Sequence, residues 1–184
     1  MKIDKPARYI GNELNSIKKD KEKVAIRFAM CFPDVYEIGM SHLGVQIFYD
    51  MFNKMEDVWC ERVYSPWPDL HKIMKEEHIP LFGLESQEPI KNLDFIGLTL
   101  NYEMCYTYVL QILDLGQIPL LAKDRTEDDP LVIVGGCCTH FFIKIKQFVE
   151  RNFTLSHIKQ IKEVCQAGMV YRPVREKNVE HLFP

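Results

Sequence analysis

The 184-residue sequence lacks the segments that mark membrane and secreted proteins. No apolar run approaches the roughly eighteen residues that a membrane-spanning helix needs. Residues 1–23 contain no apolar core of the kind found in signal peptides. The six cysteines lie mostly inside apolar segments, which is typical of reduced thiols rather than of a disulfide framework. We therefore predict a cytoplasmic protein with no membrane contact.

Several catalytic and ligand-binding motifs are also missing. The sequence has no three-glycine dinucleotide fingerprint, no phosphate-binding P-loop and no serine nucleophile elbow. Cys137, Cys138 and His140 form one cluster of soft ligands, but the paired cysteine spacings of zinc sites are absent. Buried thiols at a strand end are the favoured interpretation of that cluster. We therefore assign no catalytic residue and no metal ligand.

The formal net charge is −3, and basic terminal segments flank an acidic centre. The basic residues are not interleaved with aromatic side chains that could stack on bases. Solvated ends on a globular core are therefore favoured over a nucleic-acid surface.

What the sequence does contain is an alternation of apolar strands and amphipathic helices. Strands are predicted at residues 23–31, 58–64, 93–100 and 130–136, with a minor strand at "PLFGLES". The alternation predicts an α/β fold, a Rossmann-like, open and mostly parallel sheet flanked by helices. We divide the chain into a short N-terminal arm (1–22), the Rossmann-like domain (23–140) and a helical C-terminal tail (141–184).

The segment "FPDVYEIGMSHLG" joins the first strand to a helix for which Ser41 is the predicted N-cap. Leu43, Ile47, Met51 and Met55 recur every four residues along this helix, with Val45, Phe48 and Phe52 alongside. This apolar face is expected to pack on the sheet.

The carboxyl ends of the parallel strands are where an α/β sheet binds ligands. In the first such loop, Gly39 and Gly44 let the backbone approach a ligand, and the amides of Met40, Ser41 and His42 would favour an anion at the helix start. Asp34 could accept hydrogen bonds from ligand hydroxyls. A plain strand-to-helix turn with Asp34 as an Asx cap explains the same residues, so both readings stay open. His42, without a second ligand nearby in the sequence, is read as a surface histidine.

Several motifs in order carry a resemblance to a known family: "KPARYIGNELNSIKKD", "FPDVYEIGMSHLGVQIFYDMFN", "SPWPDL", "PLFGLES", "FIGLTLNYEMCYTYVLQILDLGQIPLLAKDR" and "LVIVGG". From about residue 5 to 139 the chain resembles the N-terminal region of uncharacterised radical S-adenosylmethionine (radical SAM) proteins with a cobalamin-binding-type domain. The resemblance implies a Rossmann-like domain, which in the family precedes a radical SAM barrel with a 4Fe–4S cluster. The C-x3-C-x2-C run of that cluster is absent, so neither the cluster nor S-adenosylmethionine is expected in this chain, which looks truncated.

The resemblance implies cobalamin as the cofactor, held by the strand-end loops with Thr99 and the Gly135–Gly136 pair along its nucleotide tail. The D-x-H-x-x-G motif of histidine-ligated cobalamin is not matched, so His42 is not expected to ligate cobalt. The full set of predicted cofactor-binding residues is Asp34, Tyr36, Gly39, Met40, Ser41, Gly44, Thr99, Asn101, Gly135 and Gly136.

We therefore expect a cobalamin-binding-type module, a cofactor- or partner-binding unit rather than a complete enzyme. Its expected partner is a separately encoded radical SAM domain or a second copy of the chain. The alternative is a truncated, inactive protein or an interaction module without a cofactor. Whether the chain takes part in catalysis stays open.

Overall fold

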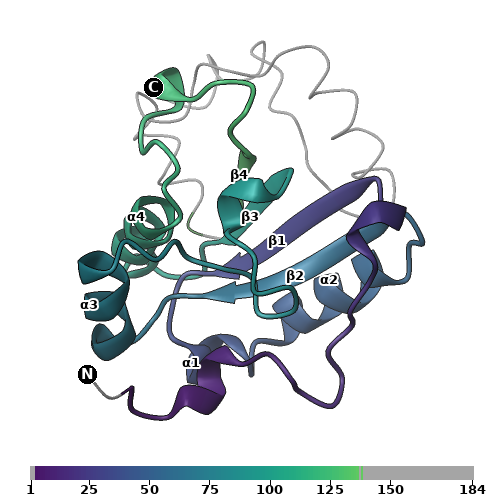
Figure 1. Cartoon of the computed structure of the whole chain (residues 1–184), viewed down its shortest axis with the longest axis horizontal. Coiled ribbons are helices and arrows are strands. Elements are labelled where there is room, and N and C mark those ends of the chain that lie inside the picture. The colour runs from purple at the N-terminus through teal and green to yellow at the C-terminus, as the bar shows by residue number, and fades with distance from the viewer. Residues whose placement is uncertain (1–2, 137, 139–184) are drawn as a thin grey trace, which may run out of the picture. The chain divides into compact units, whose positions relative to one another are not determined.

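The computed structural model describes residues 3–136 and 138. Within them, four strands form one parallel sheet in the order β2-β1-β3-β4 (Figure 1). The strands are β1 (Ile26–Phe32), β2 (Val58–Tyr64), β3 (Phe95–Thr99) and β4 (Leu131–Gly135). The predicted Rossmann-like α/β fold is confirmed. The predicted helical tail, residues 141–184, lies outside the described residues.

Helices connect the strands as the alternation predicted. They are α1 (Tyr36–Gly39), α2 (Leu43–Asn53), α3 (Pro68–Glu76) and α4 (Cys105–Leu115), with short 3-10 helices η1 (Pro6–Tyr9), η2 (Lys21–Lys23), η3 (Ile90–Asn92) and η4 (Ala122–Asp124). The minor strand at "PLFGLES" was wrong: this segment forms a single bridge, between Phe82 and Pro89. Its backbone turns back on itself at Gly83, whose N–H donates to the carbonyl of Glu88, so no extended run forms.

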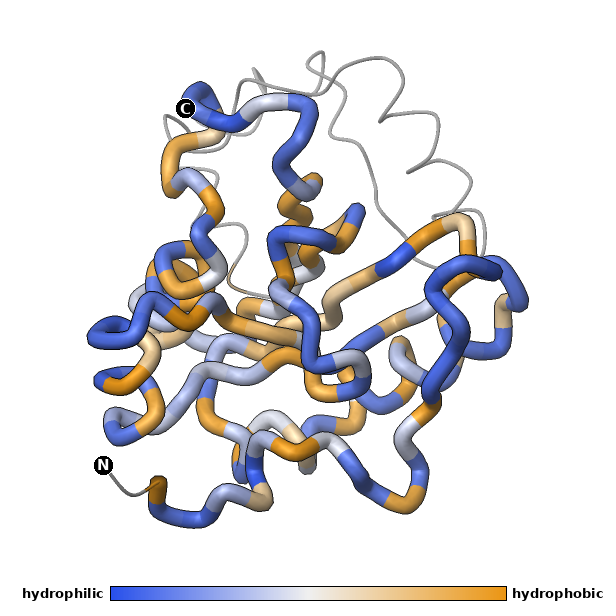
Figure 2. The backbone as a smooth tube through the Cα atoms, viewed as in Figure 1, coloured by the Kyte–Doolittle hydropathy of each residue, from blue (hydrophilic) through white to orange (hydrophobic). Residues whose placement is uncertain are grey.

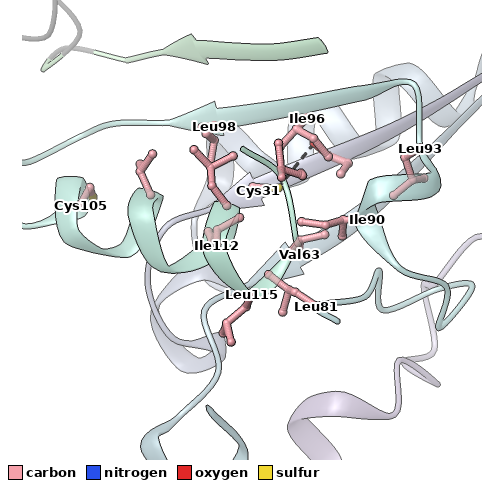
Figure 3. Packing of buried hydrophobic residues seen from close by; sticks show 14 of the residues in the cluster. Cys31, Val63, Leu81, Ile90, Leu93, Ile96, Leu98, Cys105, Ile112 and Leu115 are labelled. Carbon is pink, nitrogen blue, oxygen red and sulfur yellow. Dashed lines mark hydrogen bonds between the residues drawn. The ribbon is translucent and has the colours of Figure 1, made fainter. Parts of the chain in front are cut away.

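Two layers of side chains cover the two faces of the sheet, because successive strand residues point in opposite directions. Helices α3 and α4 cover the face of Cys31, Ile96 and Leu98 and bury it in the main apolar cluster (Figure 3). Helix α2 covers the other face, where the ring of Phe28 lies 5.0 Å from that of Phe52 (Figure 1). The helices therefore leave the carboxyl ends of the strands to the connecting loops.

The orientation of α2 corrects one prediction. Val45, Tyr49 and Phe52 face the sheet, whereas Leu43 and Ile47 are 67% and 55% exposed. Leu43 and Ile47 precede the buried residues Val45 and Tyr49 by two positions. Each therefore lies about 200° around the helix axis from that buried residue. The prediction treated the apolar residues of this helix as one broad face, whereas Leu43 and Ile47 lie away from the side that is buried.

The outer edge of β2 is covered by residues from several segments. The side-chain amide of Asn53 donates to the carbonyl of Cys60 at 2.9 Å, and its oxygen accepts the Cys60 N–H at 3.0 Å. The next outward-facing N–H, that of Arg62, donates to the carboxylate of Glu85 at 2.7 Å. Trp59 donates its indole N–H to the carbonyl of Ile17 in the N-terminal arm. These contacts close an edge that would otherwise pair with another strand.

Hydropathy follows the layers: the central strands are mainly hydrophobic and the outer turns mainly hydrophilic (Figure 2). In the described part of the chain, no helix has the length and apolar character needed to cross a membrane.

Candidate ligand site at the carboxyl edge of the sheet

The strand order reverses between β1 and β3. From β1 the chain moves to β2 on one side, and it later returns to place β3 on the other side of β1. Such a switch point opens a crevice at the carboxyl edge in doubly wound α/β sheets. The loop after β1 (residues 33–42) and the loop after β3 (residues 100–104) meet there. The end of β4 adjoins them, because Thr99 pairs with Gly135.

Asp34 joins the ends of three strands. One carboxylate oxygen accepts the backbone N–H of Val35 at 2.6 Å, and the other accepts the hydroxyl of Tyr102 from the loop after β3. The carbonyl of Asp34 accepts the N–H of Ser65, just after β2, at 2.9 Å. The first bond is the local turn cap that the sequence suggested, and the second reaches across the switch point. Asp34 therefore has both a local and a long-range role in the edge.

The burial of Asp34 sets it apart from the other buried carboxylates. Glu61 lies 2.7 Å from a guanidinium nitrogen of Arg27, and Glu85 lies 2.7 Å from one of Arg62. Asp34 is 6% exposed, yet within the described residues it forms no ion pair. Buried charges in proteins are usually paired. The charge on Asp34 is thus balanced by hydrogen bonds alone.

His42 forms the second link between the two loops. Its Nδ1 accepts the N–H of Val45 at 3.2 Å, so His42 is the N-cap of α2, and its Nε2 lies 2.7 Å from the side-chain amide of Asn101. The Asn101 atom in this contact is the amide nitrogen Nδ2, and the histidine tautomer sets which of the two nitrogens donates. The prediction of Ser41 as the cap was wrong, because its hydroxyl donates to the carbonyl of Ile38 instead.

Two backbone amides before α2 are engaged within the loop. The N–H of Met40 donates to the carbonyl of Tyr36 at 2.8 Å, and the N–H of His42 donates to the carbonyl of Gly39 at 3.1 Å. Two of the three amides of the predicted anion site therefore close the turn of α1, and the anion site stays a prediction.

Gly39 in the loop after β1 and Gly44 in the first turn of α2 serve packing. A Cβ on Gly39 would lie 2.4 Å from the ring of Tyr64, and one on Gly44 would lie 2.9 Å from the ring of His42. Met40 and Ser41, by contrast, are exposed on the surface of the loop. Both glycines thus have a structural reason to lack a side chain, independent of any ligand.

The two glycines at the end of β4, Gly135 and Gly136, have different surroundings. Gly136 has φ +111°, and a Cβ there would lie 2.2 Å from the carbonyl oxygen of Leu100. Among the described residues, no atom lies within 4 Å of the Cβ position of Gly135, and its carbonyl accepts the N–H of Leu100 at 2.7 Å. Gly136 therefore permits the close contact of two backbones, and Gly135 leaves open space beside Thr99 at the edge.

Tyr36 points toward the N-terminal arm. Its hydroxyl donates to the carboxylate of Glu13, and its ring meets Tyr64 edge-on at 5.5 Å. Burial, together with the charge of Glu13, raises the pKa of Tyr36 to about 12. The neighbouring Glu37 pairs with Arg8 at 2.6 Å. The arm therefore holds α1, and the structure separates Tyr36 from the Asp34–Tyr102 contact.

Tyr102 is the residue that the sequence reasoning missed. Thr99 and Asn101 were selected from the same strand end, but Tyr102 makes the contact with Asp34. A polar aromatic residue directly after a buried strand was the signal available for it. Its partner lies 68 positions earlier and could be assigned only once β1 and β3 were known to be neighbours.

Metal ligands do not gather at this edge. Among residues 3–136 and 138, no group of three His, Cys, Asp or Glu side chains is placed to hold a metal ion. The predicted soft-ligand cluster falls largely outside that part of the chain, because Cys137 and His140 are not described.

Comparison with known proteins gives one family match. A family model described as "Radical SAM proteins, N-terminal" matches residues 44–174, more than half of the chain. The matched region begins in α2, so it includes Thr99, Asn101 and the glycine pair but not the loop of Asp34. No curated protein and no solved structure matches significantly.

Proposed function

Because this chain belongs to the family of N-terminal regions of radical SAM proteins, we propose that it is a cobalamin-binding-type module that presents its ligand at the carboxyl edge of the sheet. The observation that carries the proposal is the strand order β2-β1-β3-β4, which brings the loops after β1 and β3 and the end of β4 to one edge. Asp34, Thr99 and Asn101 place a few polar groups at that edge, and a few such groups suffice to orient a ligand in a small-molecule site.

The residues at this edge fit cobalamin binding without a histidine ligand to cobalt, and they do not fit binding through His42. Both nitrogens of His42 are engaged, by Val45 and Asn101, so ligation of cobalt by this histidine does not fit. The open space at Gly135 beside Thr99 fits a bulky tail lying against the backbone. Thr99, Asn101, Gly135 and the carboxylate of Asp34 would then hold the cofactor, without a histidine ligand.

In this proposal the chain binds and orients, and the cluster chemistry comes from a radical SAM domain outside the described residues. Cobalamin, when bound, supplies a cobalt centre that carries carbon groups and electrons. The described residues supply the shape of the edge, a carboxylate acceptor at Asp34 and amide groups from Asn101. No catalytic role is assigned to any of them.

The test is a titration with hydroxocobalamin and with adenosylcobalamin, followed by the cobalamin absorbance spectrum and the melting temperature. Saturable binding should raise the melting temperature, because a ligand that binds the folded state stabilises it. Gly135→Leu fills the open space at the edge without meeting another atom at Cβ, and it should abolish binding. Ala25→Leu places the same side chain at the amino end of β1 and should leave binding unchanged. A folded protein that binds neither hydroxocobalamin nor adenosylcobalamin contradicts the proposal.

A second function, that of a partner-binding module, is favoured by one specific observation. Met40, just before α2, and Leu43 and Ile47 in its first half expose apolar side chains. Single exposed apolar residues are ordinary, but several together typically mark a contact surface. The expected partner is a radical SAM domain or a second copy of the chain. Changing Leu43 and Ile47 together to Gln should abolish association measured by light scattering without lowering the melting temperature.

A further inference from the structure

Within the described residues, the buried carboxylate of Asp34 has fewer hydrogen-bond donors than it can accept and no cationic partner. A carboxylate can accept about four hydrogen bonds, and within the described residues this one accepts two, from Val35 and Tyr102. It has no cationic partner there, unlike Glu61 and Glu85, whose burial is similar. A buried polar group with unused hydrogen-bonding capacity calls for an explanation, and a ligand that donates to it is one.

The two donors to Asp34 differ in how firmly they are held. Val35 is the next residue in the chain, and Ser65 fixes the Asp34 backbone from the end of β2. Tyr102 belongs to the short loop between β3 and α4, is half-buried against the rim of the main apolar cluster, and is followed by the exposed residues Glu103 and Met104. Movement of the Tyr102 side chain would uncover one carboxylate oxygen without breaking any strand pair. Asp34 is therefore the fixed partner and Tyr102 the replaceable one.

We propose that Asp34 accepts a hydrogen bond from the ligand, from an alcohol O–H or an amide N–H, at the position that the Tyr102 hydroxyl occupies. A carboxylate only accepts hydrogen bonds, so this position excludes phosphate. The amides of Met40 and His42, which could have bound phosphate, are engaged within the loop. The inference rests on the proposed function in taking this edge as the ligand site. Cobalamin carries both kinds of donor, in its corrin amides and its ribose.

The test compares the wild-type protein with Tyr102→Phe and Asp34→Asn. Removing the competing hydroxyl of Tyr102 should tighten ligand binding about tenfold, because a hydrogen bond to a charged group no longer has to be broken. Replacing the carboxylate by a neutral amide in Asp34→Asn should weaken binding about tenfold for the same reason. Tyr49→Phe is the matched control, since its hydroxyl contacts Ile17 in the arm and not this edge.

Four probes separate the chemistry: hydroxocobalamin, cobinamide, which keeps the corrin amides but lacks the ribose, adenosine, which has a ribose but no corrin amides, and inorganic phosphate. Calorimetry gives the affinity and the melting temperature verifies that each variant is folded. Cobinamide binding that depends on Asp34 places the donor on the corrin side chains. Adenosine binding that depends on Asp34, and that is retained by purine riboside, which lacks the adenine amino group, identifies the donor as a ribose hydroxyl. Phosphate should bind none of the proteins.

The failures are distinguishable. If adenosine binding depends on Asp34 while hydroxocobalamin and cobinamide do not bind, the inference stands and the cobalamin proposal fails. If cobalamin binds wild type, Tyr102→Phe and Asp34→Asn with one affinity, the proposed function stands and the inference fails. The inference is also overturned if Tyr102→Phe, which keeps the ring and should fold, binds none of the donor-bearing probes.

Discussion

Glu85 contacts Arg62 twice: its carboxylate accepts the backbone N–H of Arg62 and, with its other oxygen, the side-chain Nε, each at 2.7 Å. The first bond satisfies the edge of β2, and the second neutralises a guanidinium buried under α2. Burial acts to lower the pKa of Arg62, but Glu85 and Glu13 outweigh it and the pKa lies above its ordinary value. The two carboxylates therefore offset the cost of burying the charge of Arg62.

Glu85→Gln should lower the free energy of unfolding by about 3 kcal/mol, the lower end of the range for breaking a buried ion pair, since Glu13 still faces Arg62. Urea unfolding of purified protein measures the difference. Asp50→Asn removes an exposed pair with Lys54 and should cost at most about 0.5 kcal/mol. Equal effects from the two substitutions would show that the buried pair has no special weight.

The neighbouring glycines after β4 should respond differently to the same substitution. Gly136→Ala should cost about 1 to 3 kcal/mol from its positive φ alone, with the contact to the Leu100 carbonyl in addition. Gly135→Ala meets no atom and should change stability by at most about 0.5 kcal/mol. Melting temperatures of the two variants, measured side by side, check this. A destabilised Gly135→Ala would mean that another group occupies the space beside it.

The strands were predictable because their apolar and β-branched runs are continuous. The run at 58–64 gave β2 with its observed bounds even though Glu61 and Arg62 stand in its middle. The partners of these two charges were not predictable, because Arg27, Glu85 and Glu13 come from separate segments. Likewise, the apolar residues of α2 did not show which of them would be buried, since packing on β1 and β2 makes that choice, with Phe52 against Phe28.

At the candidate site the sequence located the loops but not their links. Asp34, Thr99 and Gly135 were placed at the carboxyl edge by the general rule for α/β sheets. The Asp34–Tyr102 and His42–Asn101 contacts depend on β3 lying beside β1, which follows from long-range strand order and not from any local pattern.

The N-terminal arm should make stability sensitive to acid through Glu13. Burial acts to raise the pKa of Glu13, but hydrogen bonds from Tyr36 and Arg62 outweigh it and the net shift is downward. A lowered pKa in the folded state means that the stabilisation is fully present above the ordinary value, 4.5, and is lost as the pH falls through the folded value. Glu13→Gln should flatten this part of the stability curve between about pH 5 and pH 3. Urea midpoints measured across that range test it, and parallel curves for the two proteins would contradict the assignment.

The assignment of His42 as the N-cap of α2 can be tested by mutation, with Ser41 as the control position. His42→Ala should lower the free energy of unfolding by about 1 kcal/mol, the usual cost of an N-cap, because the Val45 N–H loses its acceptor. Ser41→Ala removes a hydroxyl that bonds only the local Ile38 carbonyl and should change stability by at most about 0.5 kcal/mol. The reverse order of the two effects would restore Ser41 as the cap.

The same histidine also tests whether the two loops are coupled. Asn101→Ala breaks the contact across the switch point and leaves the cap of α2 in place. If the contact links the loops, the double variant with His42→Ala should lose less than the sum of the single losses, by about 0.5 kcal/mol or more. Urea unfolding of the four proteins completes this cycle. Additive losses would show that His42 serves α2 alone, and the Asp34–Tyr102 bond would then remain as the side-chain link between the loops after β1 and β3 in the described residues.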